Sequence, residues 1–210
     1  MGAPSVYLLK PAFQGRLRPL AEILANLGIT ANQVTVFACT LSAGFGLILI
    51  SHPESRAALL LFPFLLFVRM GLNALDGILA REFGQKSLLG AYLNELGDVV
   101  SDVFLYLPFV LRPEFDARWM ATVFVLTVIS EMAGVVAVLT GASRRYDGPM
   151  GKSDRALLFG ALAAWYGLGG RVTSGAAYLF PRLLVLLLII TVINRVRNGV
   201  AERKAGGIND

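Results

Sequence analysis

Six long apolar segments alternate with short polar stretches along this chain of 210 residues. A helix needs about 20 residues to cross the hydrocarbon core of a bilayer, and the segments approach or exceed that length. They lie at 34–50, 57–79, 88–111, 119–140, 154–169 and 175–195. We therefore expect an all-α integral membrane protein with six transmembrane helices, the fifth being the shortest uninterrupted apolar run.

The segment 5–28, before the first span, mixes apolar and basic positions in a pattern that can form an amphipathic helix. We expect it to lie on the membrane surface, although Pro11 and Pro19 also allow an ordinary cytoplasmic extension. The tail 203–210 contains two glycines and is expected to be disordered. The whole chain, 1–210, is thus predicted to form a single membrane domain.

The composition supports a membrane protein and excludes several other classes. Apolar and aromatic residues make up 56% of the chain, charged residues 16%, and the mean hydropathy is +0.66. The single cysteine, Cys39, and the single histidine, His52, exclude an intrachain disulfide framework and a metal site built from several such residues. The net charge of +5 accompanies no soluble basic domain, so we expect membrane lipid and no nucleic acid as a partner.

The basic residues are unevenly divided between the two ends of the predicted spans. The termini and the even-numbered loops carry thirteen of the 19 lysines and arginines, and the odd-numbered loops carry five. Basic residues accumulate on the cytoplasmic side of membrane proteins. Both termini and the loops around Arg81 and Arg145 are therefore predicted to be cytoplasmic.

Placing an ionisable side chain inside a membrane span costs free energy, so such side chains usually have charged or polar partners. Arg69, Asp102 and Glu131 fall near mid-depth on consecutive predicted helices, so they can pair. A buried ion network that fixes helix packing is one interpretation. The relay of a small transporter is another.

A second polar set lies near the predicted cytoplasmic ends of two helices. Asn73 and Asp76 are three residues apart, and Asn94 and Asp98 are four apart, so each pair shares a helical face. The loop 81–86 can bring the two faces together. Clustered oxygen donors suit a hard cation such as Mg²⁺ or Mn²⁺. The alternative is a set of carboxylates that are merely hydrated at the membrane boundary.

The same residues form a motif that resembles the signature of the CDP-alcohol phosphotransferases, D-x-x-D-G-x-x-A-R-x8-G-x-x-x-D-x-x-x-D. Here it runs from Asn73 to Asp98, with the spacing kept throughout. The segment 28–35 is similar to the start of that family's first span, and 151–155 to the segment that opens its fifth. The resemblance extends from about residue 9 to residue 197.

The resemblance implies an integral membrane enzyme of phospholipid biosynthesis, a CDP-alcohol phosphatidyltransferase. Such an enzyme transfers a phosphatidyl or other substituted phosphate group from CDP-diacylglycerol or a similar donor to an alcohol hydroxyl, and releases CMP. It implies Mg²⁺ or Mn²⁺ as cofactor, a multi-pass location in a bacterial inner membrane and, as is common in the family, a homodimer. Glycerol phosphate, inositol phosphate and serine all stay open as acceptors.

Carried over by motif position, the resemblance also assigns roles to residues. Metal ligands would stand at Asn73, Asp76, Asn94 and Asp98, and Asp98 would also be the general base; Gly77, Ala80, Arg81 and Gly90 would shape the nucleotide site. Lys152, Arg144 and Arg145 would face phosphate or acceptor at the cytoplasmic mouth, or would form an ordinary basic loop.

The sequence departs from the motif at two of its four acid positions, which are Asn73 and Asn94. An amide oxygen can coordinate a hard cation but brings no charge, so metal affinity should fall. Glu95 and Asp102 are the residues that can restore charge, although Glu95 points about 100° away from Asn94 on an ideal helix. Three outcomes follow: a one-metal enzyme, a rearranged two-metal enzyme, or a non-catalytic lipid- or nucleotide-binding member of the family.

Overall fold

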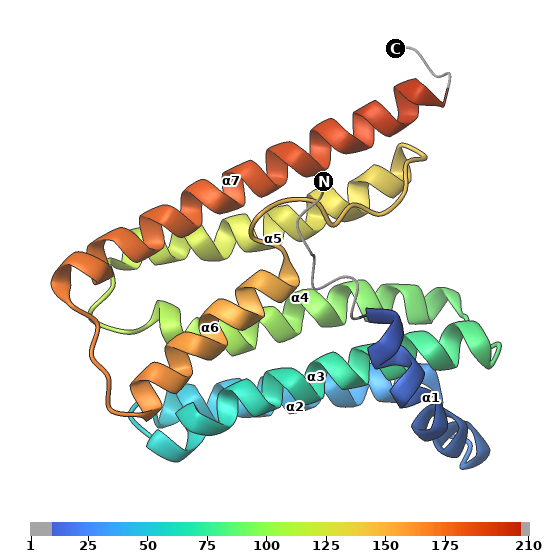
Figure 1. The fold of residues 1–210 in the computed structure, drawn as a ribbon, viewed down its shortest axis with the longest axis horizontal. Coiled ribbons are helices and arrows are strands. Elements are labelled where there is room, and N and C mark those ends of the chain that lie inside the picture. Colours follow the sequence, from blue (N-terminus) through green and yellow to red (C-terminus); the bar gives the residue numbers. More distant parts are fainter. Residues whose placement is uncertain (1–9, 207–210) are drawn as a thin grey trace. The chain divides into compact units, whose positions relative to one another are not determined.

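The computed structural model describes residues 10–206, and side chains from residue 13 onward. This part of the chain folds into helices joined by short loops, and each predicted segment coincides with one helix (Figure 1). In chain order they are α1 (Lys10–Asn26), α2 (Ala31–Ser51), α3 (Arg56–Glu82), α4 (Leu88–Val110), α5 (Ala117–Leu139), α6 (Lys152–Gly167) and α7 (Ser174–Ala205).

The two chain ends differ in part from the prediction. Helix α1 continues through Pro19, and residues 5–9 of the predicted surface helix lie outside the described residues. Helix α7 runs to Ala205, so the expectation of disorder is wrong for 203–205, while 207–210 lie outside the described residues. The last turns are held because Ser143 donates two hydrogen bonds to Glu202, and Arg203 donates one to the carbonyl oxygen of Gly141.

Four of the described helices, α2, α3, α5 and α7, are long and apolar enough to cross a membrane. Helix α4 is also long, with 23 residues, but it carries the carboxylates of Glu95, Asp98 and Asp102. Helix α6 has 16 residues, which is short for a crossing. The observed helices support a multi-pass membrane protein, and the count of six spans stays a prediction.

The described chain divides into two compact units. Unit 1 contains α1, most of α2, the larger part of α3 and most of α4, within residues 10–47 and 64–105. Unit 2 contains residues 48–63 and 106–206, where α5 and α7 lie side by side along their length (Figure 1). The signature motif belongs entirely to unit 1.

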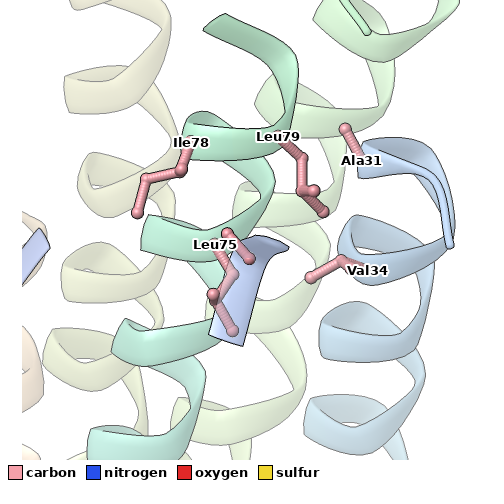
Figure 2. Close-up of a cluster of buried hydrophobic side chains, with 6 residues drawn as sticks. Ala31, Val34, Leu75, Ile78 and Leu79 are labelled. Carbon is pink, nitrogen blue, oxygen red and sulfur yellow. The ribbon is translucent and has the colours of Figure 1, made fainter. Parts of the chain in front are cut away.

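Unit 1 has a hydrophobic core immediately behind the motif. Leu75, Ile78 and Leu79 on α3 flank Asp76 in sequence and are almost fully buried. Figure 2 shows Leu79 directed toward Ala31 and Val34 of α2. Burial of apolar side chains contributes about 25 cal/mol per Å². This packing fixes the turn of α3 that carries Asp76.

The start of α2 is defined by local hydrogen bonds. Gly28 has φ +75°, and the amide of Ile29 donates to the carbonyl of Leu24, which ends α1 as a left-handed glycine cap does. Thr30 and Gln33 then exchange side-chain and backbone hydrogen bonds in a capping box. These contacts define the end of α1 and the first turn of α2 within the segment 28–35.

Candidate functional site

Asp98 lies at the centre of a hydrogen-bonded group in unit 1. Its Oδ1 accepts a hydrogen bond of 3.0 Å from Nδ2 of Asn73, one of the two amides that replace motif acids. Arg69, one helical turn before Asn73 on α3, places its guanidinium 3.6 Å from the same oxygen and donates to the Asp98 carbonyl at 3.1 Å. The Asp98 side chain is 25% exposed.

Arg69 also binds the next acid along α4. Its NH1 lies 2.8 Å from Oδ1 of Asp102, and both side chains are only 4% exposed. The predicted pairing of Arg69 with Asp102 is thus confirmed. Asp102 thus contributes to a buried ion pair, and its role as a substitute for a missing motif acid stays a prediction.

Asp76, the second motif acid, is buried, at 5% exposure. Its Oδ2 accepts a hydrogen bond of 2.8 Å from the hydroxyl of Thr35 on α2. Thr35 was expected only to mark the start of a span, and nothing in the local pattern pointed to Asp76, 41 residues away. The contact ties the motif to α2.

Near Gly90, hydrogen bonds join the start of α4 to the first turn of α2. Ser87 caps α4 by accepting a hydrogen bond of 2.9 Å from the Gly90 amide, and Asn32 donates to the Ser87 hydroxyl at 3.4 Å. A Cβ at position 90 would lie 2.7 Å from Oδ1 of Asn32, so a larger residue there would displace the Asn32 side chain. Asn94, one turn further on, is exposed.

The expected nucleotide-site residues on α3 also lie together. The Arg81 guanidinium folds back over Gly77, where a Cβ would stand 3.0 Å from NH2. Ala80 packs against the core of unit 1, while Arg81 itself is exposed. The last turn of α3 therefore presents a small residue and a cation side by side.

Unit 2 contains the basic residues that the sequence associated with phosphate. Arg145 is bound by two carboxylates, with Nε 2.7 Å from Asp147 and NH1 2.6 Å from Glu202. Burial of the Asp147 carboxyl raises its pKa, but hydrogen bonds from Arg145 and Asn198 outweigh burial and hold this pKa below its usual range. Lys152 opens α6 and is partly buried.

Glu131 is surrounded by three arginines, Arg144, Arg155 and Arg195, which we call the arginine cluster. The carboxylate lies 3.3 Å from Arg144, 3.0 Å from Arg155 and 3.4 Å from Arg195. Arg155 and Arg195 have only 1% of their side chains exposed. Glu131 therefore has ion-pair partners within its own unit, which fits the buried-network interpretation better than a transporter relay. Reading Arg155 and Arg195 as loop charges missed their burial.

The donor set of the motif suits a hard cation but is poor in charge. Asp76 and Asp98 supply carboxylates, and Asn73 and Asn94 can supply amide oxygens. Among residues 10–206, no group of three or more histidine, cysteine, aspartate or glutamate side chains is arranged to hold a metal. The oxygen donors of these residues suit a hard cation, and the number of ions stays a prediction.

Comparison with known proteins gives a consistent family. Residues 28–196 match the family model of the CDP-alcohol phosphatidyltransferases. The inner membrane protein YnbA of Escherichia coli K12 is 42% identical over 194 residues, which cover 92% of this chain and 96% of that protein. The archaetidylinositol phosphate synthase of Pyrococcus horikoshii is 35% identical over 96 residues, covering 45% of this chain and 47% of the synthase.

Solved structures show the same fold. The crystal structure of Mycobacterium tuberculosis phosphatidylinositol phosphate synthase (PgsA1) with CDP-DAG bound has a TM-score of 0.71 and 21% identity, covering 91% of this chain and 97% of that one. The structure of the same synthase with manganese and citrate gives the same TM-score and identity, with 91% and 92% coverage.

Proposed function

The chain belongs to the CDP-alcohol phosphatidyltransferase family, and from this premise we propose that it transfers a phosphatidyl or other substituted phosphate group from a CDP-linked donor to an alcohol hydroxyl, releasing CMP. The observation that carries the proposal is the contact of Asn73 with Asp98, which brings the two halves of the motif together across α3 and α4. The donor we propose is CDP-diacylglycerol or a similar lipid nucleotide.

Asp98 is the residue that we assign as general base. Its carboxylate is oriented by Asn73 and Arg69, and it is more exposed than Asp76 or Asp102. A positioned carboxylate within hydrogen-bond reach of the acceptor hydroxyl can take its proton. The deprotonated oxygen then attacks the phosphorus of the donor, and CMP leaves.

Asp76, Asp98, Asn73 and Asn94 are the residues that would hold one Mg²⁺ or Mn²⁺. A divalent ion supplies neutralisation of charge on the diphosphate. Gly77, Ala80, Arg81 and Gly90 would shape the nucleotide site, where the exposed Arg81 guanidinium adds positive charge beside Gly77. The small residues leave room for the cytidine.

Lys152, Arg144 and Arg145 are proposed to face phosphate or acceptor groups. The Arg144 guanidinium lies over the ring of Tyr146, with its Cζ 4.9 Å from the ring centroid, and it also contacts Glu131. Arg145 is more tightly engaged, since Asp147 and Glu202 both bind it. An ordinary cytoplasmic basic loop is the alternative for these three residues.

The membrane arrangement follows from the charge distribution. We propose six spans in a single membrane domain, both termini and the motif on the cytoplasmic side, and α1 on the membrane surface. A homodimer is proposed from family resemblance. The location is a bacterial inner membrane, in keeping with the inner membrane relative from Escherichia coli.

The test is an assay of purified protein with radiolabelled CDP-diacylglycerol, Mg²⁺ or Mn²⁺, and a panel of alcohols. We expect release of CMP and formation of a new phospholipid with at least one acceptor. Asp98→Asn should lower the rate by at least about 100-fold, the usual worth of a general base. Asp116→Asn is the matched control, because asparagine caps helix α5 as well as aspartate does.

A second candidate function is binding of lipid or nucleotide without turnover, which the amides Asn73 and Asn94 favour. In that case cytidine nucleotides would raise the thermal unfolding midpoint through binding. No CMP would appear with any alcohol over long incubation, and Asp98→Asn would leave that background unchanged. This pair of results would replace the transferase proposal.

A further inference from the structure

Unit 2 contains a pocket that the transferase proposal does not use. It lies where α5 and α7 begin and α6 ends, and its volume is about 400 Å³, within the usual range for small-molecule sites. All of the residues that line it belong to unit 2, and along α3 the pocket residue Arg56 is 20 positions before Asp76. The polar lining residues are Glu54, Arg56, Arg112, Glu114, Tyr166 and Arg171.

Arg112 organises one wall of this pocket. Its Nε lies 2.8 Å from Glu114 and its NH2 lies 3.2 Å from Glu54, while NH1 donates to the carbonyl of Pro53 at 3.1 Å. The guanidinium stacks on the ring of Tyr166, 3.7 Å from its centroid, and the Tyr166 hydroxyl donates to Glu114 in a short hydrogen bond. Both glutamates of the pocket are therefore already bound by Arg112.

The electrostatics of this wall favour a fixed ion pair. Burial of the Glu114 carboxyl raises its pKa, but hydrogen bonds from Tyr166 and Arg112 outweigh burial and hold this pKa below its usual range. The carboxylate thus stays charged and stays with Arg112. What remains for a ligand is the positive charge on the rest of the lining.

That charge comes from Arg56 and Arg171. Within residues 10–206, neither guanidinium has an ion pair or hydrogen bond to another residue, and both residues are exposed. Three arginines and two glutamates leave the lining with one net positive charge. An anionic ligand with oxygen acceptors could accept hydrogen bonds from both guanidinium groups.

The loop that carries Arg171 is held by local hydrogen bonds. Gly169 has φ +87°, and the amide of Gly170 donates to the carbonyl of Trp165 at 2.8 Å, which closes the end of α6. The Trp165 indole in turn donates to the carbonyl of Arg171 at 3.2 Å, and a side chain at position 170 would clash with the Trp165 ring. Arg171 is thereby held at the rim.

We propose that this pocket binds a phosphate group through Arg56 and Arg171, and that the phosphate belongs to the headgroup of an anionic phospholipid. Exposed apolar side chains surround the same end of unit 2, among them Leu60, Trp165 and Leu168. Tryptophan is typical of membrane interfaces, where headgroup phosphates lie. The site is separate from the proposed transfer reaction and does not depend on it.

The experiment measures binding of dihexanoyl phosphatidylglycerol to the full-length protein in detergent, by native mass spectrometry and by the thermal unfolding midpoint. Inorganic phosphate and dihexanoyl phosphatidylcholine are the parallel probes. The test variant is Arg56→Gln with Arg171→Gln. The control is Arg118→Gln with Arg197→Gln, which removes the same charge from two exposed arginines outside the pocket.

We expect phosphatidylglycerol to bind wild type and control alike, and to bind the test variant at least about tenfold more weakly, as loss of charge-assisted hydrogen bonds predicts. The unfolding midpoint without lipid should be the same in all three proteins. If inorganic phosphate alone shows this pattern, the site is an oxyanion site, and the lipid assignment is overturned. Equal binding to test variant and control, or no binding by wild type, would overturn the proposal altogether.

Discussion

The two units each bury an ionic cluster, and the two clusters have opposite composition. In unit 1 the guanidinium of Arg69 faces the carboxylates of Asp98 and Asp102. In unit 2 the carboxylate of Glu131 faces the three guanidinium groups of the arginine cluster. The first has an excess of negative charge and the second an excess of positive charge.

The difference teaches how each cluster tolerates the loss of a partner. In unit 1 Arg69 has two carboxylates, so removing one leaves the other. In unit 2 Glu131 is a partner of all three arginines, so its removal takes a carboxylate from three guanidinium groups at once. Buried charges that lose their partner are strongly destabilising.

The largest effect is therefore expected from Glu131→Gln. The amide keeps the size of the side chain but removes the negative charge of Glu131 from the arginine cluster. We expect a loss of about 3–5 kcal/mol in the free energy of unfolding. Titration of the protein with SDS in mixed micelles measures it, and a loss no larger than that of a surface substitution would contradict the comparison.

A smaller effect is expected from Asp102→Asn in unit 1. Arg69 keeps its contacts with the carboxylate and the carbonyl oxygen of Asp98, so the loss should be about 1–3 kcal/mol. The same titration applies. A loss equal to that of Glu131→Gln would show that the two clusters respond alike.

Unit 1 contains a glycine that lets two of its helices approach closely. A Cβ at Gly46 of α2 would clash with the backbone of Phe104 on α4, whereas one at Gly44 meets no atom within 4 Å. We expect Gly46→Ala to cost about 1–3 kcal/mol from overpacking. Gly44→Ala is the matched control and should be neutral or slightly stabilising. Equal midpoints for the two variants would refute the close approach.

The smallest effect concerns acid sensitivity at the edge of unit 2. Because the pKa of Asp147 is lowered in the folded protein, its stabilisation is complete above the unfolded pKa of about 3.9 and is lost as pH falls through the folded pKa. Asp147→Asn should remove this contribution, by less than about 1 kcal/mol because the pair is partly exposed. Unfolding midpoints between pH 5 and pH 2.5 measure it. A variant whose midpoint falls with pH as steeply as that of wild type would show that Asp147 contributes nothing.

The helices could be predicted from sequence because apolar runs of about 20 residues are a local signal. The pairing of Arg69 with Asp102 was also predictable, since a charged group in a span needs a partner. The contact of Thr35 with Asp76 was not, because it depends on how α2 packs against α3. Arg155 and Arg195 were read as loop charges for a similar reason: only the folded chain shows that Glu131 gathers them.

Arg69 also affects the charge balance of unit 1 when no metal ion is bound. Small metal-dependent domains often cannot fold until their ion arrives, because clustered ligands repel one another without it. Here a guanidinium attached to the chain itself already stands beside Asp98 and Asp102. A counterion of this kind cannot be diluted or chelated, so these two carboxylates have a positive partner whether or not the proposed cation is present.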